Sequence, residues 1–511
     1  MKIAKHGIYN IFTGVFGQLA TIIFAFLTPK LVIENYGSEI NGLLHSFTQI
    51  FTYFSLFEAG VGYASLQALY GPVANKDEKK IEGILSATRV FYNRTGLLYA
   101  AGVTAVALLY PLAVHISLPY FYVAAIIFFG GIGGCINFFY QGKYIQLMQV
   151  EGYTYVTTSI NTFCNILISV FKVVLLLCGY NVLSVQISAF LVSVIRATLF
   201  YLYIHKHYRL LNLKAPPDFD AISQKNSVLV HQISYLVFSS TDVLLLTFLT
   251  QDLRIVSVYT LYNMIVSTAF SVVQQISSGF DFYLGQMYST AREKYLKIYH
   301  ALEIFHLVVV YSVMSTIYLS LMPFMRLYMG KVTDIDYFNK IYPLLFVLIP
   351  LLTHGRTAAN STITFAGHFE KTQKYAIYEA LINLAVTFVG VILWGIPGAL
   401  LGTIIASIFR TININWYVYK FLIPVSPLKT IKRWGICLGL FLVIVIANTI
   451  HPVALSGYLQ IALFALLTGC GMLALYGGIQ FLANKEEQIM IVELIKVFSN
   501  KIFAKKLISG E

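Results

Sequence analysis

The sequence predicts an all-α protein that spans a membrane about fourteen times. Of its 511 residues, 58% are hydrophobic and only 11% are charged, whereas roughly a quarter of the residues in a soluble domain carry a charge. The apolar runs are long and continuous, such as LLYAAGVTAVALLYPLAV from Leu97. In hydrocarbon only helices and closed barrels satisfy every backbone polar group, and barrel strands would alternate in polarity over short segments. We therefore expect helices of about twenty apolar residues each.

Polar breaks between the apolar runs define the individual spans. The first run follows Lys2 and Lys5, and no small-residue cleavage site comes after it, so we expect it to be a retained helix. The second and eighth runs are the longest, and helices of such length tilt or protrude from the bilayer. The predicted spans are 7–30, 41–70, 90–113, 119–141, 157–179, 183–204, 227–250, 256–288, 299–322, 341–364, 375–394, 398–418, 435–451 and 458–482.

The spans divide into two halves around one polar segment. HKHYRLLNLKAPPDFDAISQKN, from His205, contains two prolines and reads as a linker. The second and eighth spans both end with glycines, a Leu-Tyr or Tyr-Leu pair and a charged loop, a spacing typical of transporters built from two halves. The predicted parts are a six-helix lobe at 1–204, a cytoplasmic linker at 205–226, a second six-helix lobe at 227–420, two additional helices at 435–482, and an amphipathic cytoplasmic tail at 483–511.

Lysine and arginine are distributed unevenly between alternate loops. If the N-terminus is cytoplasmic, the cytoplasmic segments hold 24 of these residues and the outer loops hold 4. Because cytoplasmic loops of membrane proteins are rich in Lys and Arg, both termini are predicted to be cytoplasmic. Basic loops facing anionic lipids account for the net charge of +13. Membrane lipids are thus expected partners, and nucleic acid is not.

Nothing in the sequence reads as an enzyme. It contains no phosphate-binding loop, nucleophile elbow or zinc-ligand spacing, so no catalytic residue, metal site or cofactor is predicted. The five cysteines lie in apolar spans, where they are expected to pack as inert groups. A membrane glycan polymerase or ligase stays open as an alternative of another class, although the largest outer loop, about 323–340, is short for such an enzyme.

Charged residues inside the spans are the most informative, because they are costly in lipid and usually face a wet interior or one another. At about 1.5 Å per residue, several lie roughly 20 Å or more from the nearer end of their span. Arg94 and Glu379 are expected near an interface, where snorkelling or capping explains them. The deep residues form either interhelical ion pairs or a functional cavity. The predicted substrate-binding residues are Arg196, Arg356, Arg410 and Lys172, and the predicted ion-coupling residues are Asp242 and Glu58.

The excess of cations at mid-depth has a chemical consequence. A cavity lined by these side chains would attract an anionic substrate such as a phosphate or pyrophosphate, and the planar guanidinium of arginine suits that geometry. Small residues near Glu58 and after Gln274 are expected to permit close helix packing. The 36 tyrosines supply interfacial belts, and an aromatic surface also suits sugar rings.

Four stretches resemble the Wzx-type polysaccharide flippases of the multidrug/oligosaccharidyl-lipid/polysaccharide exporter superfamily, and the resemblance runs in order over nearly the whole chain. The stretches are YGSEINGLLHSFTQIFTYFSLFEAGVG at 36–62, SSTDVLLLTFL and VSVYTLYNMI within 239–265, AGHFEKTQKYAIYEALINL at 366–384, and GIPGALLGTIIASIFRT at 395–411. Asp242 and Arg356 match the family pattern best. A proline that often follows that arginine in the family is absent, because Thr357 and Ala358 follow it here.

The resemblance implies two six-helix lobes around a central cavity, plus two further helices. It also implies transport of an undecaprenyl-pyrophosphate-linked oligosaccharide from the inner to the outer leaflet of a bacterial plasma membrane, for surface polysaccharide synthesis. The implied partners are that lipid-linked oligosaccharide, a proton or sodium ion, and other polysaccharide assembly proteins. A lipid II flippase and a drug/cation antiporter of the same superfamily remain alternatives, although an antiporter for cations would present acidic rather than basic residues.

Overall fold

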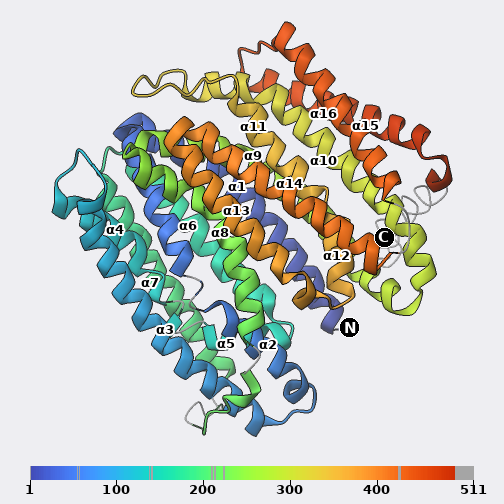
Figure 1. Cartoon of the computed structure of the whole chain (residues 1–511). Helices are drawn as coiled ribbons and strands as arrows, with labels where there is room; N and C mark the ends of the chain where they lie inside the picture. Colours follow the sequence, from blue (N-terminus) through green and yellow to red (C-terminus); the bar gives the residue numbers. More distant parts are fainter. Residues whose placement is uncertain are drawn as a thin grey trace, which may run out of the picture. The chain divides into compact units, whose positions relative to one another are not determined.

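The computed structural model describes residues 2–54, 56, 58–136, 138–139, 142–208, 211, 215–222, 225–423 and 427–488, and all regular structure within these ranges is helical (Figure 1). Ten of the described helices are long and apolar enough to cross a membrane. The predicted class, an all-α polytopic membrane protein, is therefore confirmed. Most of the predicted amphipathic tail, from residue 489 onward, lies outside the described residues.

The chain forms two compact units, which we describe separately. Unit 1 is Met1–Thr260 with Lys331–Ile335, and unit 2 is Leu261–Gly330 with Asp336–Glu511. The two predicted lobes, the linker between them and the additional pair of helices stay predictions about domain organisation.

Unit 1 is a bundle in which α6 packs against α1 and α7, and α4 packs against α3 and α7. Its core is apolar and aromatic, but hydroxyl groups also bond between helices. Ser46 on α1 accepts hydrogen bonds from Tyr110 and Thr247, each at 2.8 Å, and such bonds help hold helices together in lipid. Its helices are α1 (Lys2–Phe54), α2 (Ala59–Ala74), α3 (Glu78–Ala113), α4 (Tyr120–Ile132), α5 (Gly142–Val150), α6 (Thr154–Leu177), α7 (Val182–His207), η3 (Asp220–Ile222), α8 (Lys225–Thr250) and the start of α9 (Leu253–Thr290).

The first two predicted spans are divided differently in the structure. α1 consists of two helices that meet at a kink inside the predicted loop at 31–40, where Gly37 leaves the helical region, with φ 84° and ψ 169°. Only glycine adopts such a conformation without strain. The backbone N–H and the hydroxyl of Ser38 both bond the Asp334 carboxylate, at 2.7 and 2.8 Å, which fixes the chain after this bend. The predicted span 41–70 is instead broken, since α1 ends at Phe54 and α2 begins at Ala59.

Among the described residues, unit 2 contains the rest of α9, seven further α-helices and the short 3₁₀ helix η4. α10 packs against α11, α12, α15 and α16, while α14 packs against α11, α12 and α13. In Figure 1, α13 and α14 appear as neighbouring orange helices, and α15 and α16 as the red pair near the C-terminus. The helices are α10 (Arg292–Met329), α11 (Tyr342–His354), α12 (Thr357–Phe365), α13 (Phe369–Trp394), α14 (Ile396–Phe421), α15 (Leu428–Ile450), α16 (Tyr458–Ala483) and η4 (Lys485–Glu487).

α13 and α14 form a tight helical hairpin. The turn between them is Gly395, whose positive φ of 60° favours glycine. Further along, the two backbones touch at Gly390 and Gly398, where a Cβ on Gly398 would lie 1.8 Å from the Gly390 carbonyl oxygen. No side chain fits between them, so α13 and α14 are held as one rigid pair.

The predicted span 341–364 is also broken. α11 ends at His354, Gly355 and Arg356 form a turn, and α12 begins at Thr357. A Cβ on Gly355 would lie 2.5 Å from the indole ring of Trp434, so only glycine lets α15 approach at this point. The proline expected from the resemblance is absent here, yet the helix still breaks at Gly355 and Arg356.

Candidate substrate site

Three ion-paired side chains from three helix segments form the strongest candidate site in unit 2, and we call them the arginine triad. Arg356 lies in the turn before α12, Glu379 on α13 and Arg410 on α14. Glu379 Oε1 accepts from Arg356 Nη1 at 2.6 Å, and Glu379 Oε2 accepts from Arg410 Nη1 at 3.0 Å. One carboxylate therefore bridges two guanidinium groups. The α13–α14 hairpin positions two of the three, since Glu379 and Arg410 lie at nearly equal distances from Gly395.

The triad is buried and carries more positive than negative charge. The side chains of Arg356, Glu379 and Arg410 are 11%, 6% and 15% exposed. Within these three residues, two guanidiniums face one carboxylate, which is an excess of one positive charge among the ion pairs described here. The Nε of Arg410 is buried without a hydrogen-bond partner in the part of the chain that the structure describes. A buried donor that lacks a partner costs about 1–3 kcal/mol, so a bound anion would gain from reaching it.

Glu379 corrects one expectation from the sequence. The depth argument assigned it to an interface, where capping or snorkelling would explain it. Snorkelling and capping do not explain it, because Glu379 is buried and pairs with both arginines. Arg94, which was expected in the same kind of position, is exposed.

A polar face continues from the triad along α12. Thr357, Asn360, Ser361 and Thr364 recur at helical spacing, and together with Phe365 they line an open cavity of about 220 Å³. Such a surface offers hydroxyl and amide groups beside one aromatic ring. This combination can bind sugar hydroxyls through hydrogen bonds and a sugar face through the ring.

The two other predicted substrate residues lie in unit 1 with partners of their own. Arg196 on α7 is half-buried and donates from Nη2 to the Asn165 side chain on α6, at 2.7 Å. Lys172 on α6 is half-buried and interacts electrostatically with His45 on α1. The structure thus brings Arg356 and Arg410 together and gives Arg196 and Lys172 separate surroundings. Their assignment to a substrate site stays a prediction.

Asp242, the first predicted ion-coupling residue, is 4% exposed on α8. It accepts a hydrogen bond from the Tyr259 hydroxyl on α9 at 2.9 Å. Next to it, Thr241 shares a hydrogen bond of 2.7 Å with Tyr53 on α1. The acid therefore lies where three helices of unit 1 meet, and a tyrosine rather than an arginine is the partner shown for it.

Glu58, the second predicted coupling residue, is half-buried and occupies the position before α2. It interacts electrostatically with Tyr92, whose hydroxyl accepts from Gln146 Nε2 at 3.1 Å. A Cβ on Gly62 would lie 3.0 Å from both of these polar atoms, so the small residue allows their approach. Glu58 thus lies at the break between α1 and α2, much as Arg356 lies at the break between α11 and α12.

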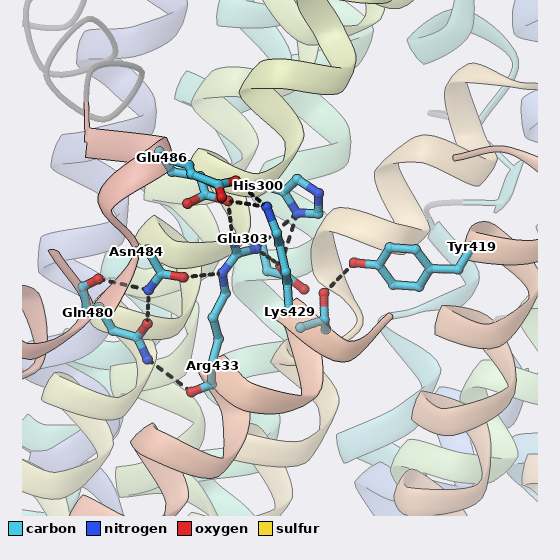
Figure 2. A network of polar contacts seen from close by, with 10 residues as sticks. His300, Glu303, Tyr419, Lys429, Arg433, Gln480, Asn484 and Glu486 are labelled. Carbon is cyan, nitrogen blue, oxygen red and sulfur yellow. Dashed lines mark hydrogen bonds and ion pairs between the residues drawn. The ribbon is translucent and has the colours of Figure 1, made fainter. Parts of the chain in front are cut away.

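A second buried cluster, which we call the Arg433 network, did not emerge from the sequence (Figure 2). Arg433 on α15 is one of the 24 cations that the sequence places in cytoplasmic segments, and the structure buries its side chain, which is 1% exposed. Its Nη1 donates to Glu303 at 2.7 Å and lies 2.9 Å from His300 Nδ1. Its Nη2 donates to Glu487 at 2.6 Å, and its Nε donates to Asn484 at 2.8 Å. All three guanidinium nitrogens are therefore satisfied.

The network ties α15 and the end of α16 to α10. Gln480 on α16 donates to the Arg433 carbonyl at 2.9 Å, and Lys429 pairs with Glu486 and Glu487 of η4. Figure 2 shows these contacts converging on Arg433, with the Tyr419 hydroxyl bonded nearby to Thr430. The basic run KTIKRW gave no sequence signal for this arrangement, since the partners of Arg433 lie far away in the chain.

Comparisons with known proteins identify the fold. No protein-family model and no curated protein matches the sequence. Among solved structures, lipid II flippase MurJ in an inward closed conformation matches with a TM-score of 0.66 and 15% identity, over 93% of this chain and 99% of that chain. An inward-facing multidrug resistance MATE family transporter of the MOP superfamily matches with a TM-score of 0.65 and 13% identity, over 82% of this chain and 96% of that chain. MATE in a bent conformation matches with a TM-score of 0.54 and 13% identity, over 83% and 94%. The fold of this chain is therefore the one seen in MATE transporters and in MurJ.

Proposed function

We propose that this protein is a flippase that moves an oligosaccharide linked to undecaprenyl pyrophosphate from the inner to the outer leaflet of a bacterial plasma membrane, by alternating access. The observation that carries the proposal is the arginine triad, a buried site with excess positive charge inside a transporter fold. A pyrophosphate is the anionic group of such a lipid. Two guanidiniums held by one carboxylate present further N–H donors to it in a fixed geometry.

The sugar part of the substrate explains why a protein is needed. Each hydroxyl moved into hydrocarbon without a partner costs several kcal/mol, so an oligosaccharide with a dozen such groups faces a barrier of tens of kcal/mol. A polar, water-filled path removes most of that barrier. The polar face of α12, directly after Arg356, is a suitable part of this path. The lipid tail stays in the bilayer, and no covalent chemistry is required.

Ion coupling belongs to the same proposal. The membrane potential favours outward movement of an anion by about 2.3 kcal/mol per charge per 100 mV, and it also favours the inward return of an empty, cationic carrier. A proton or sodium ion bound at Asp242 or Glu58 changes the charge of the empty carrier by one. Asp242 is the stronger candidate because it is more deeply buried.

The test is transport by variants of the triad. Arg410→Ala should lower flipping of the lipid-linked oligosaccharide at least tenfold in reconstituted vesicles, as measured by an impermeant lectin, and Arg410→Lys should restore part of it. Arg94→Ala, at an exposed arginine on α3, is the matched control and should transport normally. Normal transport by Arg410→Ala at normal protein level would remove the triad from the proposal.

Substrate competition separates the alternatives. The same vesicles can be loaded with lipid II or with a cationic drug in place of the oligosaccharide lipid. We expect the oligosaccharide lipid to be moved fastest, because the triad favours an anion and the α12 face favours extended sugars. Preference for lipid II would assign the chain the activity named for MurJ, and export of the drug would favour an antiporter. A new glycosidic bond in the product would indicate a polymerase or ligase.

The proposed orientation has both termini in the cytoplasm. Reporter fusions after Lys76 and after Lys331 should then report opposite sides of the membrane. Fusions that report the same side would overturn the predicted topology. Other polysaccharide assembly proteins are the expected protein partners, and co-purification from the native membrane tests for them.

A further inference from the structure

Two histidines form a buried pair next to the arginine triad that the proposed transport function does not use. His306 on α10 and His354 at the end of α11 are each 6% exposed. Their rings lie 16° from parallel with centroids 6.2 Å apart, and the ring of Phe270 covers His354 at 4.9 Å. We call these two residues the histidine pair.

Three of the four ring nitrogens in the pair have no hydrogen-bond partner among the described residues. They are both nitrogens of His306 and the Nε2 of His354. The fourth, His354 Nδ1, lies 2.6 Å from the Thr357 hydroxyl. Buried polar groups are nearly always bonded, and an exception calls for an explanation such as a bound water, an ion or a functional role. Three exceptions at one place point to something that the pair binds.

The geometry restricts what that ligand is. A neutral imidazole has one donor and one acceptor nitrogen, so two facing rings each offer a nitrogen that can take a proton. Among the described residues no group of three or more His, Cys, Asp and Glu side chains could hold a metal ion. The ring spacing leaves room for a single small bridge, and a water molecule needs two to four polar partners, which these nitrogens supply.

The charges around the pair are of both signs. Glu303, one turn before His306, interacts with it electrostatically. Arg356 follows His354 by two residues. The described titratable and charged groups on the elements packed around the pair include Tyr299, His300, Glu303 and Tyr311 on α10, Arg356 before α12, Glu379 on α13, Arg410, Tyr417 and Tyr419 on α14, Arg433 on α15, Tyr476 on α16 and Glu487 on η4.

We propose that His306 and His354 form a buried proton-binding site, which holds one proton between the two rings through one bridging water molecule. The proton comes from solvent, and no bond other than N–H is formed. A second proton would place two like charges about 6 Å apart in a buried setting, which is strongly unfavourable. The pair therefore takes up one proton and not two.

The bound proton acts on the triad next to it. It adds one positive charge close to Arg356, where there is already an excess of one, so it strengthens the attraction for an anion. By linkage, an anion at the triad strengthens proton binding by the same factor. For unit charges about 10 Å apart at an effective dielectric constant of about 20, the factor is about tenfold. This second part rests on the proposed function, because it takes the triad as an anion site.

The first experiment needs no substrate and follows each histidine separately. Deuterium exchange at the imidazole Cε1, measured by mass spectrometry on the full chain in nanodiscs from pH 4 to 9, reports the protonation of each ring. In the wild type, the pair should take up one proton across this range. In His306→Gln, the protonation midpoint of His354 should shift by one pH unit or more. The control is His115→Gln, at an exposed loop histidine, which should leave the midpoints of both His306 and His354 unchanged.

Two results would overturn the proton site. One is wild-type protein in which each ring takes up its own proton or in which neither takes one, and this result does not depend on any variant folding. The other is a His354 midpoint that is the same in the wild type and in the His306→Gln variant, provided that the variant unfolds at the normal temperature.

The second experiment adds inorganic pyrophosphate. Saturating pyrophosphate should raise the midpoint of the pair by about one pH unit. The affinity of the protein for pyrophosphate should rise about tenfold as the pH falls through that midpoint. In the His306→Gln/His354→Gln variant the rise should be smaller, because only pyrophosphate itself changes its protonation there. A pair that takes one proton but does not respond to bound pyrophosphate overturns the link to the triad. If pyrophosphate does not bind to the wild type at all, the anion site fails while the first experiment still decides the proton site.

Discussion

Unit 2 contains two buried clusters of charge that resemble each other in composition and differ in balance. In the Arg433 network every guanidinium nitrogen has a partner, and three carboxylates, Glu303, Glu486 and Glu487, face the two cations Arg433 and Lys429. In the arginine triad one carboxylate serves two arginines, and Arg410 Nε is left without a partner among the described residues. Burying charge is costly unless it is paired and bonded.

The difference separates a structural cluster from a candidate binding site. A cluster that satisfies all its donors has nothing to gain from a ligand, and it can hold α10, α15 and α16 together. A cluster with an excess cation and an unused donor gains from an anion. Equal burial therefore does not imply an equal role, and the balance of partners is the more useful guide.

The largest expected effect is on stability, from Arg433→Ala. Removing the guanidinium leaves Glu303 and Glu487 buried without their main partner, and breaking a buried ion pair in this way costs about 3–5 kcal/mol. Thermal and denaturant unfolding in detergent should show the loss. Lys432→Ala, one residue earlier and exposed, should have little effect. An Arg433→Ala protein with wild-type stability would break the comparison.

Glu379→Gln tests how much the arginine triad stabilises the fold. We expect a smaller loss of stability than for Arg433→Ala. Glutamine keeps one acceptor oxygen and loses the charge, and a hydrogen bond to a charged group contributes about 1.5–3 kcal/mol. We expect a loss of about 1–3 kcal/mol, together with a clear loss of transport. Glu370→Gln, exposed in the first turn of α13, is the control. A larger loss of stability than that of Arg433→Ala would mean that the triad is the main structural cluster.

Asp242 is a buried acid that belongs to neither cluster, and Asp242→Asn tests whether its charge serves transport or structure. Asparagine keeps the shape and an acceptor for the Tyr259 hydroxyl but removes the charge. We expect transport in vesicles to lose its dependence on an imposed proton or sodium gradient, with the unfolding free energy changed by about 1 kcal/mol. Asp220→Asn, at an exposed acid, should keep the dependence. If the dependence survives in Asp242→Asn while the rate falls, Asp242 is structural.

The smallest effect is expected at the exposed edge of the Arg433 network. The hydrogen bond from Lys429 lowers the pKa of Glu486 below its usual value of 4.5. Because the pKa of Glu486 is lowered in the folded protein, the contact stabilises the fold at pH values above 4.5. This stabilisation is lost as the pH falls through the lowered pKa. Glu486→Gln should therefore flatten the acid side of the stability profile slightly and leave the stability at pH 7 almost unchanged, because exposed ion pairs contribute little. A pronounced change at pH 7 would contradict this.

Much of the fold was predictable, because membrane helices are encoded in contiguous apolar runs. The pairs 375–394 and 398–418, and 435–451 and 458–482, correspond closely to α13 to α16. The breaks after Phe54 and His354 were not predicted, because only short polar stretches mark them, with Glu58 at the first and Arg356 at the second. The signal at the second break is Gly355, but its meaning depends on Trp434, which lies far away in the sequence.

The residues of the candidate site were also predictable only in part. Arg356 and Arg410 stood out because lone arginines in apolar runs are costly. Their shared partner was missed, because depth along one helix says nothing about a neighbouring helix. The signal was present in the hairpin, where Glu379 and Arg410 lie at nearly equal distances from Gly395. Arg433 had no such signal, since neighbouring lysines made it look like a loop cation and its partner Glu303 lies 130 residues away.

The contact between Gly355 and Trp434 also has an optical consequence. The chain has three tryptophans, and Trp394 and Trp416 are 61% and 50% exposed on α13 and α14. Replacing these two with phenylalanine leaves Trp434 as the sole indole, packed against the turn that holds Arg356. Its emission wavelength and intensity then follow the polarity of that turn in real time. Rapid mixing with substrate can thus record movement at the break without any attached label.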